Sequence, residues 1–389
     1  MSKKSKNKPF LFILVGLLIM IGTISYVVYY SINHSENSSK ENISKEAVIS
    51  KSNENKSNKK ENSSKKEDIK KDVYTEAIIS FAGDSTIGHD TKFAFANSLP
   101  DVLSKNNNDF SYFYKNVASI FKNDDISIVN LETTFTNSKD RAEKQFNFKA
   151  DPSYAETLPL GNIEGVNISN NHIYDYKQKG FTDTLQALKA NNINYFGEGN
   201  VWIKEVKGTK FGFLGYTGYN DYSEFRQKIE NDIKKIKNQN AIVIINFHWG
   251  LENNYYPIET QINLAHFAID KGADLIIGHH PHVIQGIEQY KGKIICYSLG
   301  NFCFGGNFNP KDKDTFIFQA KYKLKNGKPE SYGVRVIPCS ISSVNYINDY
   351  CPTPLKDSEK ERLLKKLNGL SNNAGFKISD EFYNIDVKN

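Results

Sequence analysis

Short runs of β-branched and aromatic residues alternate with amphipathic stretches from about residue 73 onward. The strand-like runs cover 76–83, 125–132, 164–169, 210–216, 241–247, 273–278 and 293–300. Helical periodicity occupies 181–192, 223–239 and 259–272 between them. This alternation is typical of layered α/β folds. Two further strand-like runs, 314–324 and 332–342, have no helical stretch between them and indicate a mixed or second sheet.

An uncharged run from Phe10 to Ile32 follows four lysines within residues 1–9. Its 23 residues suffice to cross a hydrocarbon core, which is about 30 Å thick. We expect an uncleaved transmembrane anchor at 10–32, since no small-residue cleavage site follows the run; a cleaved signal and a buried helix are the alternatives. The lysines before the span place segment 1–9 in the cytoplasm and the main domain outside the cell, as a single-pass protein of the cell membrane.

Residues 33–72 contain mostly Ser, Asn, Lys and Glu and almost no apolar side chains. Such a segment cannot bury enough surface to offset its chain entropy, so we expect a disordered tether. A polycation that senses wall polymers or lipid head groups is the alternative. The folded domain is expected at 73–342, followed by a covering tail at 343–389 that contains one helix at 358–367.

Composition and charge narrow the functional classes. The mean hydropathy of −0.53 excludes a multi-span membrane protein. Residues 1–73 carry the whole net charge of +6, so the rest of the chain is neutral and has no basic footprint for nucleic acid. The four cysteines lack CxxC spacing. A Cys339–Cys351 disulfide and four ordinary thiols remain equal alternatives.

Polar residues follow almost every predicted strand. They are Asp84, Glu132, Asn170, Asn171, His172, His248, His279, His280, His282 and Asn301. Each has an ordinary explanation by itself, such as a turn residue or a core imidazole. Loops at the carboxyl ends of strands converge on one crevice, however, so we expect these side chains to lie together. Carboxylate, amide and imidazole groups are typical ligands of Mn²⁺, Fe²⁺ or Zn²⁺, and the sequence predicts a divalent-metal site.

The same residues carry a resemblance to a known family. The blocks, in order, are GDS (83–85), VNLE (129–132), SNNHIYDY (169–176), NFHWGLE (246–252), GHHPHVIQG (278–286) and YSLGNF (297–302). This order resembles the CapA-like capsule-synthesis proteins, which are the poly-γ-glutamate synthesis proteins of the calcineurin-like metallophosphatase superfamily. The similarity covers most of residues 76–305. It implies an α/β fold built as a four-layer α/β/β/α sandwich, with two metal ions at the strand ends.

The resemblance also implies a role for individual residues. The implied metal ligands are Asp84, Glu132, Asn171, His248 and imidazoles of the GHHPH block, in the order of preference His282, His280, His279. Glu132 would bridge the two ions. His172 would be the general acid just beyond the metals. The sequence departs from the superfamily's Asp-x-His motif at Asp84, and His89 would reach the site only through a different loop geometry.

Two supporting residues follow from spacing. Asp175, three residues after His172, would either orient the His172 ring or cap the following helix. Glu252, four residues after His248, would orient the His248 ring. By contrast, His266 lies within a helical stretch and is expected to be a packing residue.

Two functions are consistent with these features. The first is a membrane-anchored extracellular protein that takes part in the biosynthesis, export or anchoring of a capsule polymer of the poly-γ-glutamate type. Its partners would be the membrane, the anionic polymer or its precursor, and other membrane subunits of polymer synthesis. The second is an extracytoplasmic, metal-dependent phosphoesterase, a hydrolase acting on wall or lipid-linked phosphate. The fold alone does not decide whether the protein is an enzyme.

Overall fold

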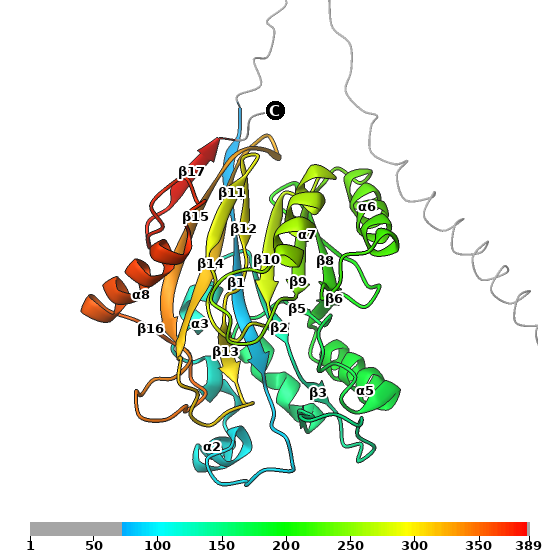
Figure 1. Ribbon diagram of the computed structural model, residues 1–389, viewed down its shortest axis with the longest axis vertical. Helices are drawn as coiled ribbons and strands as arrows, with labels where there is room; N and C mark the ends of the chain where they lie inside the picture. The colour runs from blue at the N-terminus through cyan, green and yellow to red at the C-terminus, as the bar shows by residue number, and fades with distance from the viewer. Residues whose placement is uncertain (1–71, 387–389) are drawn as a thin grey trace, which may run out of the picture. The chain divides into compact units, whose positions relative to one another are not determined.

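The computed structural model describes residues 72–386 (Figure 1). The predicted cytoplasmic segment 1–9, the anchor 10–32 and nearly all of the tether 33–72 lie outside the described residues. Among the helices of the described part, none combines the length and apolar character that a membrane span requires.

The first sheet has nine strands and is mixed. Its main path runs β16 (Thr353–Pro354), β15 (Lys328–Ser340), β14 (Asp314–Lys325), β1 (Tyr74–Thr86), β2 (Ile126–Leu131), β5 (Gly165–Asn167) and β6 (Asn194–Phe196). Two further strands, β13 (Asn301–Phe304) and β17 (Tyr383–Asp386), pair with β1 and β15. Strand β1 is central, since it pairs with β14 in the antiparallel direction and with β2 and β13 in parallel.

The second sheet has six strands. Its order is β11 (Ile287–Tyr290), β12 (Lys293–Cys296), β10 (Leu275–His279), β9 (Ala241–His248), β8 (Thr209–Thr217) and β7 (Trp202–Val206). Its four inner strands run parallel to one another, and the edge strands β7 and β11 are antiparallel to β8 and β12. A small two-stranded sheet joins β3 (Thr134–Phe135) to β4 (Lys149–Ala150).

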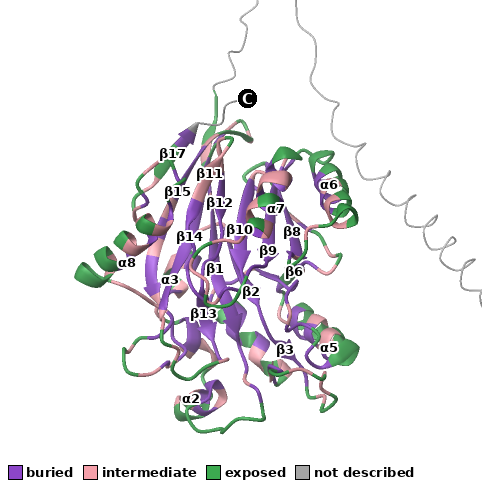
Figure 2. Ribbon diagram, in the orientation of Figure 1, coloured by how far each residue is buried: buried purple, intermediate pink, exposed green. Residues whose placement is uncertain are grey.

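Alternating side chains explain how the sheets pack. In β9, Ile242 and Ile244 belong to a core shared by both sheets, whereas Val243 and Ile245 face a helical layer. That layer contains α6 (Ser223–Lys237) and α7 (Glu259–Asp270). Because successive side chains of a strand point to opposite faces, each sheet buries both of its faces. The buried strands and the exposed outer sides of the helices are visible in Figure 2.

The outer face of the nine-stranded sheet is covered by short helices and one longer helix. They are α2 (Leu99–Lys105), η1 (Phe110–Tyr114), α3 (Ala118–Lys122), η2 (Pro152–Glu156), α4 (Thr157–Leu160) and α5 (Lys177–Ala190). The described layers therefore follow the expected α/β/β/α order. Helix α8 (Asp357–Leu370) packs Leu363 and Leu367 into the core between the sheets.

The tail differs from the prediction of one loop and one helix. Residues 353–354 and 383–386 form β16 and β17, which extend the nine-stranded sheet along β15. Their sequences are too short to show a strand period, so tertiary pairing decides them. The four cysteines are free and buried, which agrees with ordinary thiols and not with a Cys339–Cys351 disulfide.

A close backbone approach holds the end of β1 in place. The amide of Asp84 donates to the carbonyl of Gly300 at 2.9 Å. A Cβ atom on Gly83 would lie 2.0 Å from that carbonyl oxygen, so only glycine fits there. This contact places Asp84 opposite Asn301, a residue more than 200 positions away in the sequence.

Candidate metal centre

Two buried carboxylates form the floor of the centre. Asp84, near the end of β1, accepts from Asn130 Nδ2 at 2.8 Å and from the backbone amide of His280 at 3.2 Å. Glu132 directly follows β2 and is fully buried. Neither of its carboxylate oxygens has a hydrogen-bond partner among the residues that the structure describes. An ionised carboxylate without partners is costly in a protein interior, and a bound cation would satisfy it.

Three imidazoles surround these carboxylates. His248, at the end of β9, places Nε2 3.4 Å from Glu132 Oε1. His282 lies between the carboxylates, with Nδ1 3.3 Å from Asp84 Oδ2 and Nε2 3.9 Å from Glu132 Oε1. The ring of His280 lies against that of His248, at a centroid distance of 4.7 Å. The carboxyl ends of strands from both sheets thus meet at one place.

The donor atoms form overlapping groups in which all members lie within 4.8 Å of one another. One group contains Asp84, Glu132 and His282, and a second contains Glu132, His248 and His280. Glu132 belongs to both. Oxygen and imidazole donors at this spacing fit divalent cations of the borderline class.

The other expected ligands occupy different positions. Asn171 Oδ1 lies 2.8 Å from His248 Nε2, at the edge of the centre. His279 belongs to none of the donor groups; its Nε2 contacts Asn246 Oδ1 at 3.1 Å and its Nδ1 lies 3.6 Å from Asp84 Oδ1. His89 also stays outside these groups, since its backbone pairs with Lys149.

Burial and neighbouring charges shift the pKa values of these carboxylates and of His282, in several cases in opposite directions. Burial, followed by the charge of Asp84, raises the pKa of Glu132 well above its usual value. Burial alone would raise the pKa of Asp84, but its hydrogen bond and ion pair with His282 hold that pKa below the usual value. Burial would likewise lower the pKa of His282, yet Glu132 and Asp84 raise it to about 10. Without a bound cation, protonated His282 therefore offsets part of the negative charge of the centre, and a cation held by His282 would replace that proton.

The remaining imidazoles are neutral, as metal ligands must be. Burial, followed by the electrostatic repulsion that the nearby His280 ring would exert when protonated, lowers the pKa of His248 well below its usual value. Burial, with His282 as the next cause, lowers the pKa of His280 to about 3. Burial also lowers the pKa of His279 to about 4. Their unprotonated nitrogens can donate electron pairs at neutral pH.

His172 and Asp175 form a pair beside the centre. His172 Nδ1 lies 2.7 Å from Asp175 Oδ2, and His172 Nε2 lies 4.0 Å from Glu132 Oε1. Asp175 Oδ1 also accepts from Lys144 Nζ at 2.7 Å, and Oδ2 accepts from the amide of Phe148 at 2.5 Å. Asp175 does not cap helix α5, whose N-cap is Tyr176. Its carboxylate orients the His172 ring so that Nε2 faces the metal ligands.

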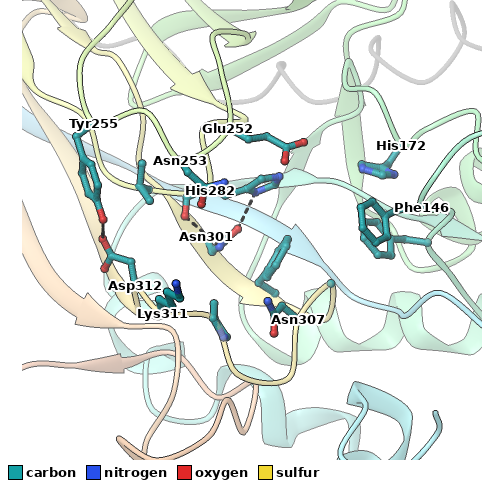
Figure 3. A pocket seen from close by; sticks show the side chains of 15 residues that line it. Phe146, His172, Glu252, Asn253, Tyr255, His282, Asn301, Asn307, Lys311 and Asp312 are labelled. Carbon is teal, nitrogen blue, oxygen red and sulfur yellow. Dashed lines mark hydrogen bonds between the residues drawn. The ribbon is translucent and has the colours of Figure 1, made fainter. Parts of the chain in front are cut away.

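The centre opens into a cavity of about 630 Å³ (Figure 3). His172, Glu252 and His282 line it on the side of the metal ligands. Tyr255, Lys311 and Asp312 lie at its other side, where the Tyr255 hydroxyl donates to Asp312. This volume is in the range of small-ligand sites.

Glu252 does not occupy its predicted position. Its carboxylate lies within 4.8 Å of the ring nitrogens of His280 and His282. No hydrogen bond joins it to His248 among the described side chains. The four-residue spacing misled the prediction because the chain leaves β9 at His248 and turns at Gly250, which has φ of +85°.

Asn301, one of the predicted strand-end residues, does lie at the centre, since its Oδ1 is 2.9 Å from His282 Nδ1. Two supporting residues escaped the sequence analysis. Asn130 lies between Asp84 and His248 and contacts His248 Nδ1 at 3.2 Å. It belongs to the VNLE block quoted above, so its place in that block was the available signal. Lys144, which contacts the carbonyl of Asn171 and the side chain of Asp175, comes from a long loop and had no such signal.

Comparisons with known proteins find similarity to bacterial capsule synthesis proteins. A family model described as "Bacterial capsule synthesis protein PGA_cap" matches residues 78–306. The "PGA biosynthesis protein CapA" of Bacillus subtilis is 28% identical over 339 residues, covering 81% of this chain and 84% of that protein. The "Capsule biosynthesis protein CapA" of Bacillus anthracis is 29% identical over 284 residues, covering 66% of each chain.

Weaker likenesses also occur. A "Probable polyglutamine synthesis accessory protein" of Mycobacterium tuberculosis is 26% identical over 208 residues, covering 46% of this chain and 55% of that protein. Among solved structures, the purple acid phosphatase PPD1 of yellow lupin matches with a TM-score of 0.34 and 8% identity, covering 73% of this chain and 55% of that chain.

Proposed function

Because the chain belongs to the PGA_cap family of bacterial capsule synthesis proteins, we propose that it takes part in the biosynthesis, export or anchoring of a capsule polymer of the poly-γ-glutamate type. The names of its relatives in two Bacillus species support this role. The predicted anchor at 10–32 would hold the domain outside the membrane, beside the polymer and the subunits that make it. Its partners would be the membrane, the anionic polymer or its precursor, and other membrane subunits of polymer synthesis.

A divalent-metal centre would be the working part of the domain. The observation that carries this proposal is the position of Glu132. Its side chain is fully buried, its two oxygens have no hydrogen-bond partner within residues 72–386, and it belongs to both donor groups. Asp84, Glu132 and His282 would hold one ion, and Glu132, His248 and His280 a second. Bound ions would supply Lewis acidity and fixed positive charge that anchors an anionic group. Mn²⁺, Fe²⁺ and Zn²⁺ all suit these donors.

The charge distribution supports metal-based recognition of an anion. Residues after 73 carry 36 basic and 36 acidic side chains, so the described domain has no excess positive charge of its own. A polyanion would therefore meet no net positive charge on this domain. The metal centre and Lys311 at the far side of the cavity are the places where an anionic group would be held.

His172 would move protons in this site. Its Nδ1 is held by Asp175, so Nε2 can take up or release a proton at an oxygen atom in the cavity. Burial lowers the pKa of His172 despite its bond to Asp175, which keeps the ring neutral in the free protein. An anionic substrate would raise that pKa again, since it adds negative charge near the ring.

A metal-dependent phosphoesterase acting outside the cytoplasm is the second candidate function. The His172–Asp175 pair favours it, because an oriented proton donor is unnecessary for a centre that only binds polymer. Both candidates share the metal centre and differ in whether a bond is hydrolysed.

The test is the metal content of the purified full-length chain and of two histidine variants. His282→Ala removes a donor and is expected to lower the bound metal with the fold retained. His266→Ala is the matched control, since His266 stacks on Tyr290 and contacts Glu288 away from the centre. If both variants retain the metal content of the wild type, the cluster is structural and the proposal is wrong. Hydrolysis of a generic phosphodiester by the same samples separates the two functions.

A further inference from the structure

A second cavity, of about 420 Å³, adjoins the cavity of the metal centre. Its lining is mainly apolar and includes Phe93, Ala94, Ala96, Phe146, Phe308 and Tyr350. We call it the aromatic cavity. Phe146, Gly306 and Asn307 line both cavities, so the two are neighbours that share a wall. In Figure 3, Phe146 lies next to His172, and Asn307 lies at the lower edge of the metal-facing cavity.

Large aromatic side chains at the aromatic cavity are exposed to solvent. Phe93 is 59% exposed and Phe308 is 57% exposed. The neighbouring Phe95 is 54% exposed, and its ring lies against that of His89 in the cavity wall. Exposed apolar side chains that gather at one cavity indicate a binding site.

The aromatic rings continue from this cavity to the metal centre. Phe93 stacks on Phe146 at 5.9 Å between centroids, and Phe146 stacks on Phe148 at 6.3 Å. The Phe148 ring lies 4.4 Å from the His172 ring. A ligand could therefore extend along one apolar wall from the surface to the proton-transferring histidine.

Two polar groups of the aromatic cavity, Asp90 and Tyr350, are bonded within the protein, whereas Nδ1 of His89 has no partner among the described residues. Asp90 accepts from Arg141 Nη2 at 2.9 Å and from the amide of Asn147 at 3.0 Å. The Tyr350 hydroxyl donates to the carbonyl of Asn97 at 2.6 Å. The His89 ring is neutral, because burial lowers its pKa. These walls offer little to a polar polymer and suit a hydrocarbon chain.

We propose that the aromatic cavity binds the hydrocarbon chain of an amphiphile whose anionic head group lies at the metal centre. This inference rests on the proposed metal-dependent function and narrows its substrate to a lipid-linked anion. The continuity of the cavities carries the choice of occupant, since head group and chain must lie within one molecule's reach. An apolar group with no charge would leave the metal-facing cavity unused.

The experiment measures how affinity depends on chain length. Full-length chain in lipid nanodiscs with Mn²⁺ is titrated with ethyl, butyl and hexyl phosphate, in competition with radiolabelled inorganic phosphate. Affinity is expected to rise by roughly two- to fourfold per added methylene, the upper value corresponding to full burial. In Phe93→Ser and Phe308→Ser, affinity for inorganic phosphate should stay unchanged while the dependence on chain length becomes flat. Leu160→Ser is the control, because Leu160 is 49% exposed on α4, outside both cavities.

The outcomes separate this inference from the function on which it rests. If phosphate binds but the length of the alkyl group has no effect on affinity, the aromatic cavity does not take a hydrocarbon chain, and the inference is overturned. If chain length matters equally in Phe93→Ser and Phe308→Ser, the alkyl group binds elsewhere, which also overturns it. If inorganic phosphate does not bind the metal-loaded protein, the proposed anion site and the inference both fail.

Discussion

Replacing Glu132 with glutamine should make the metal-free protein more stable and remove its response to metal. The Glu132 side chain is fully buried, and neither of its oxygens has a hydrogen-bond partner in the described part of the chain. Burial and the negative charge of Asp84 both raise its pKa, which means that the folded protein disfavours its ionised form. Glutamine has nearly the same shape without the charge, and its amide can donate to a neighbouring carboxylate.

The magnitude follows from two opposing effects. An unsatisfied buried polar group costs about 1–3 kcal/mol, so Glu132→Gln should raise the free energy of unfolding by about that amount without metal. A ligand that binds only the folded state adds about 4 kcal/mol when its free concentration is about 1,000 times its Kd. The wild type should gain this stabilisation, and the variant should lose most of it. The order of stability of the two proteins therefore reverses when metal is added.

Urea unfolding of the full-length chain, followed by circular dichroism with EDTA and then with Mn²⁺, measures both effects. Glu205→Gln is the control, because Glu205 is exposed on β7 and its replacement should change stability by less than about 0.5 kcal/mol. If Glu132→Gln is less stable than the wild type in EDTA, Glu132 has a structural role that the orphaned oxygens do not indicate. An equal gain from Mn²⁺ in both proteins would remove Glu132 from the ligands.

Three further predictions concern the proton donor, pH and topology. His172→Ala should keep its bound metal, but its phosphodiester turnover should fall by about 10²–10⁴-fold and polymer production should be lost. Asp84→Asn should lose both the bound metal and polymer production. Normal polymer production in His172→Ala cells would exclude a catalytic role for His172. Burial raises the pKa of Asp124 to about 7 although Ser127 donates to it. A carboxyl group whose pKa is raised on folding destabilises the protein as pH rises from about 4 to 7. Asp124→Asn should therefore increase the free energy of unfolding, measured in urea, by about 1–2 kcal/mol at pH 8 and change it little at pH 4. External protease should cut intact cells' protein within 33–72 and release residues 73–389; protection would reverse the predicted orientation.

The local pattern of apolar and polar residues determined which segments form strands and where those strands end. The β-branched runs at 241–247 and 314–324 became strands β9 and β14, because their side chains could be buried on both faces of a sheet. Polar residues directly after such runs indicated the edge where a site would form. Asp84, Glu132 and His248 were found in this way, since the end of a buried strand is visible in a single stretch of sequence.

Tertiary structure decided which of these groups meet. The GHHPH block offers three imidazoles, and sequence alone ranked them without deciding among them. Positive φ angles of +99° at His280 and +58° at His282 turn the chain so that both rings join the donor groups, whereas His279 contacts Asn246. Such backbone angles are rare for residues other than glycine and depend on the packing around them.

Contacts between distant segments were also beyond the sequence. Asp84 pairs with Asn301 across β1 and β13, and the aromatic cavity joins Phe93, Phe146 and Phe308 from three separate loops. Residue spacing determines period and strand ends because those depend on neighbours along the chain. Strand order and loop packing depend on burial summed over the whole domain, so only the folded structure determines which carboxylate stays unpartnered and which aromatic rings lie beside it.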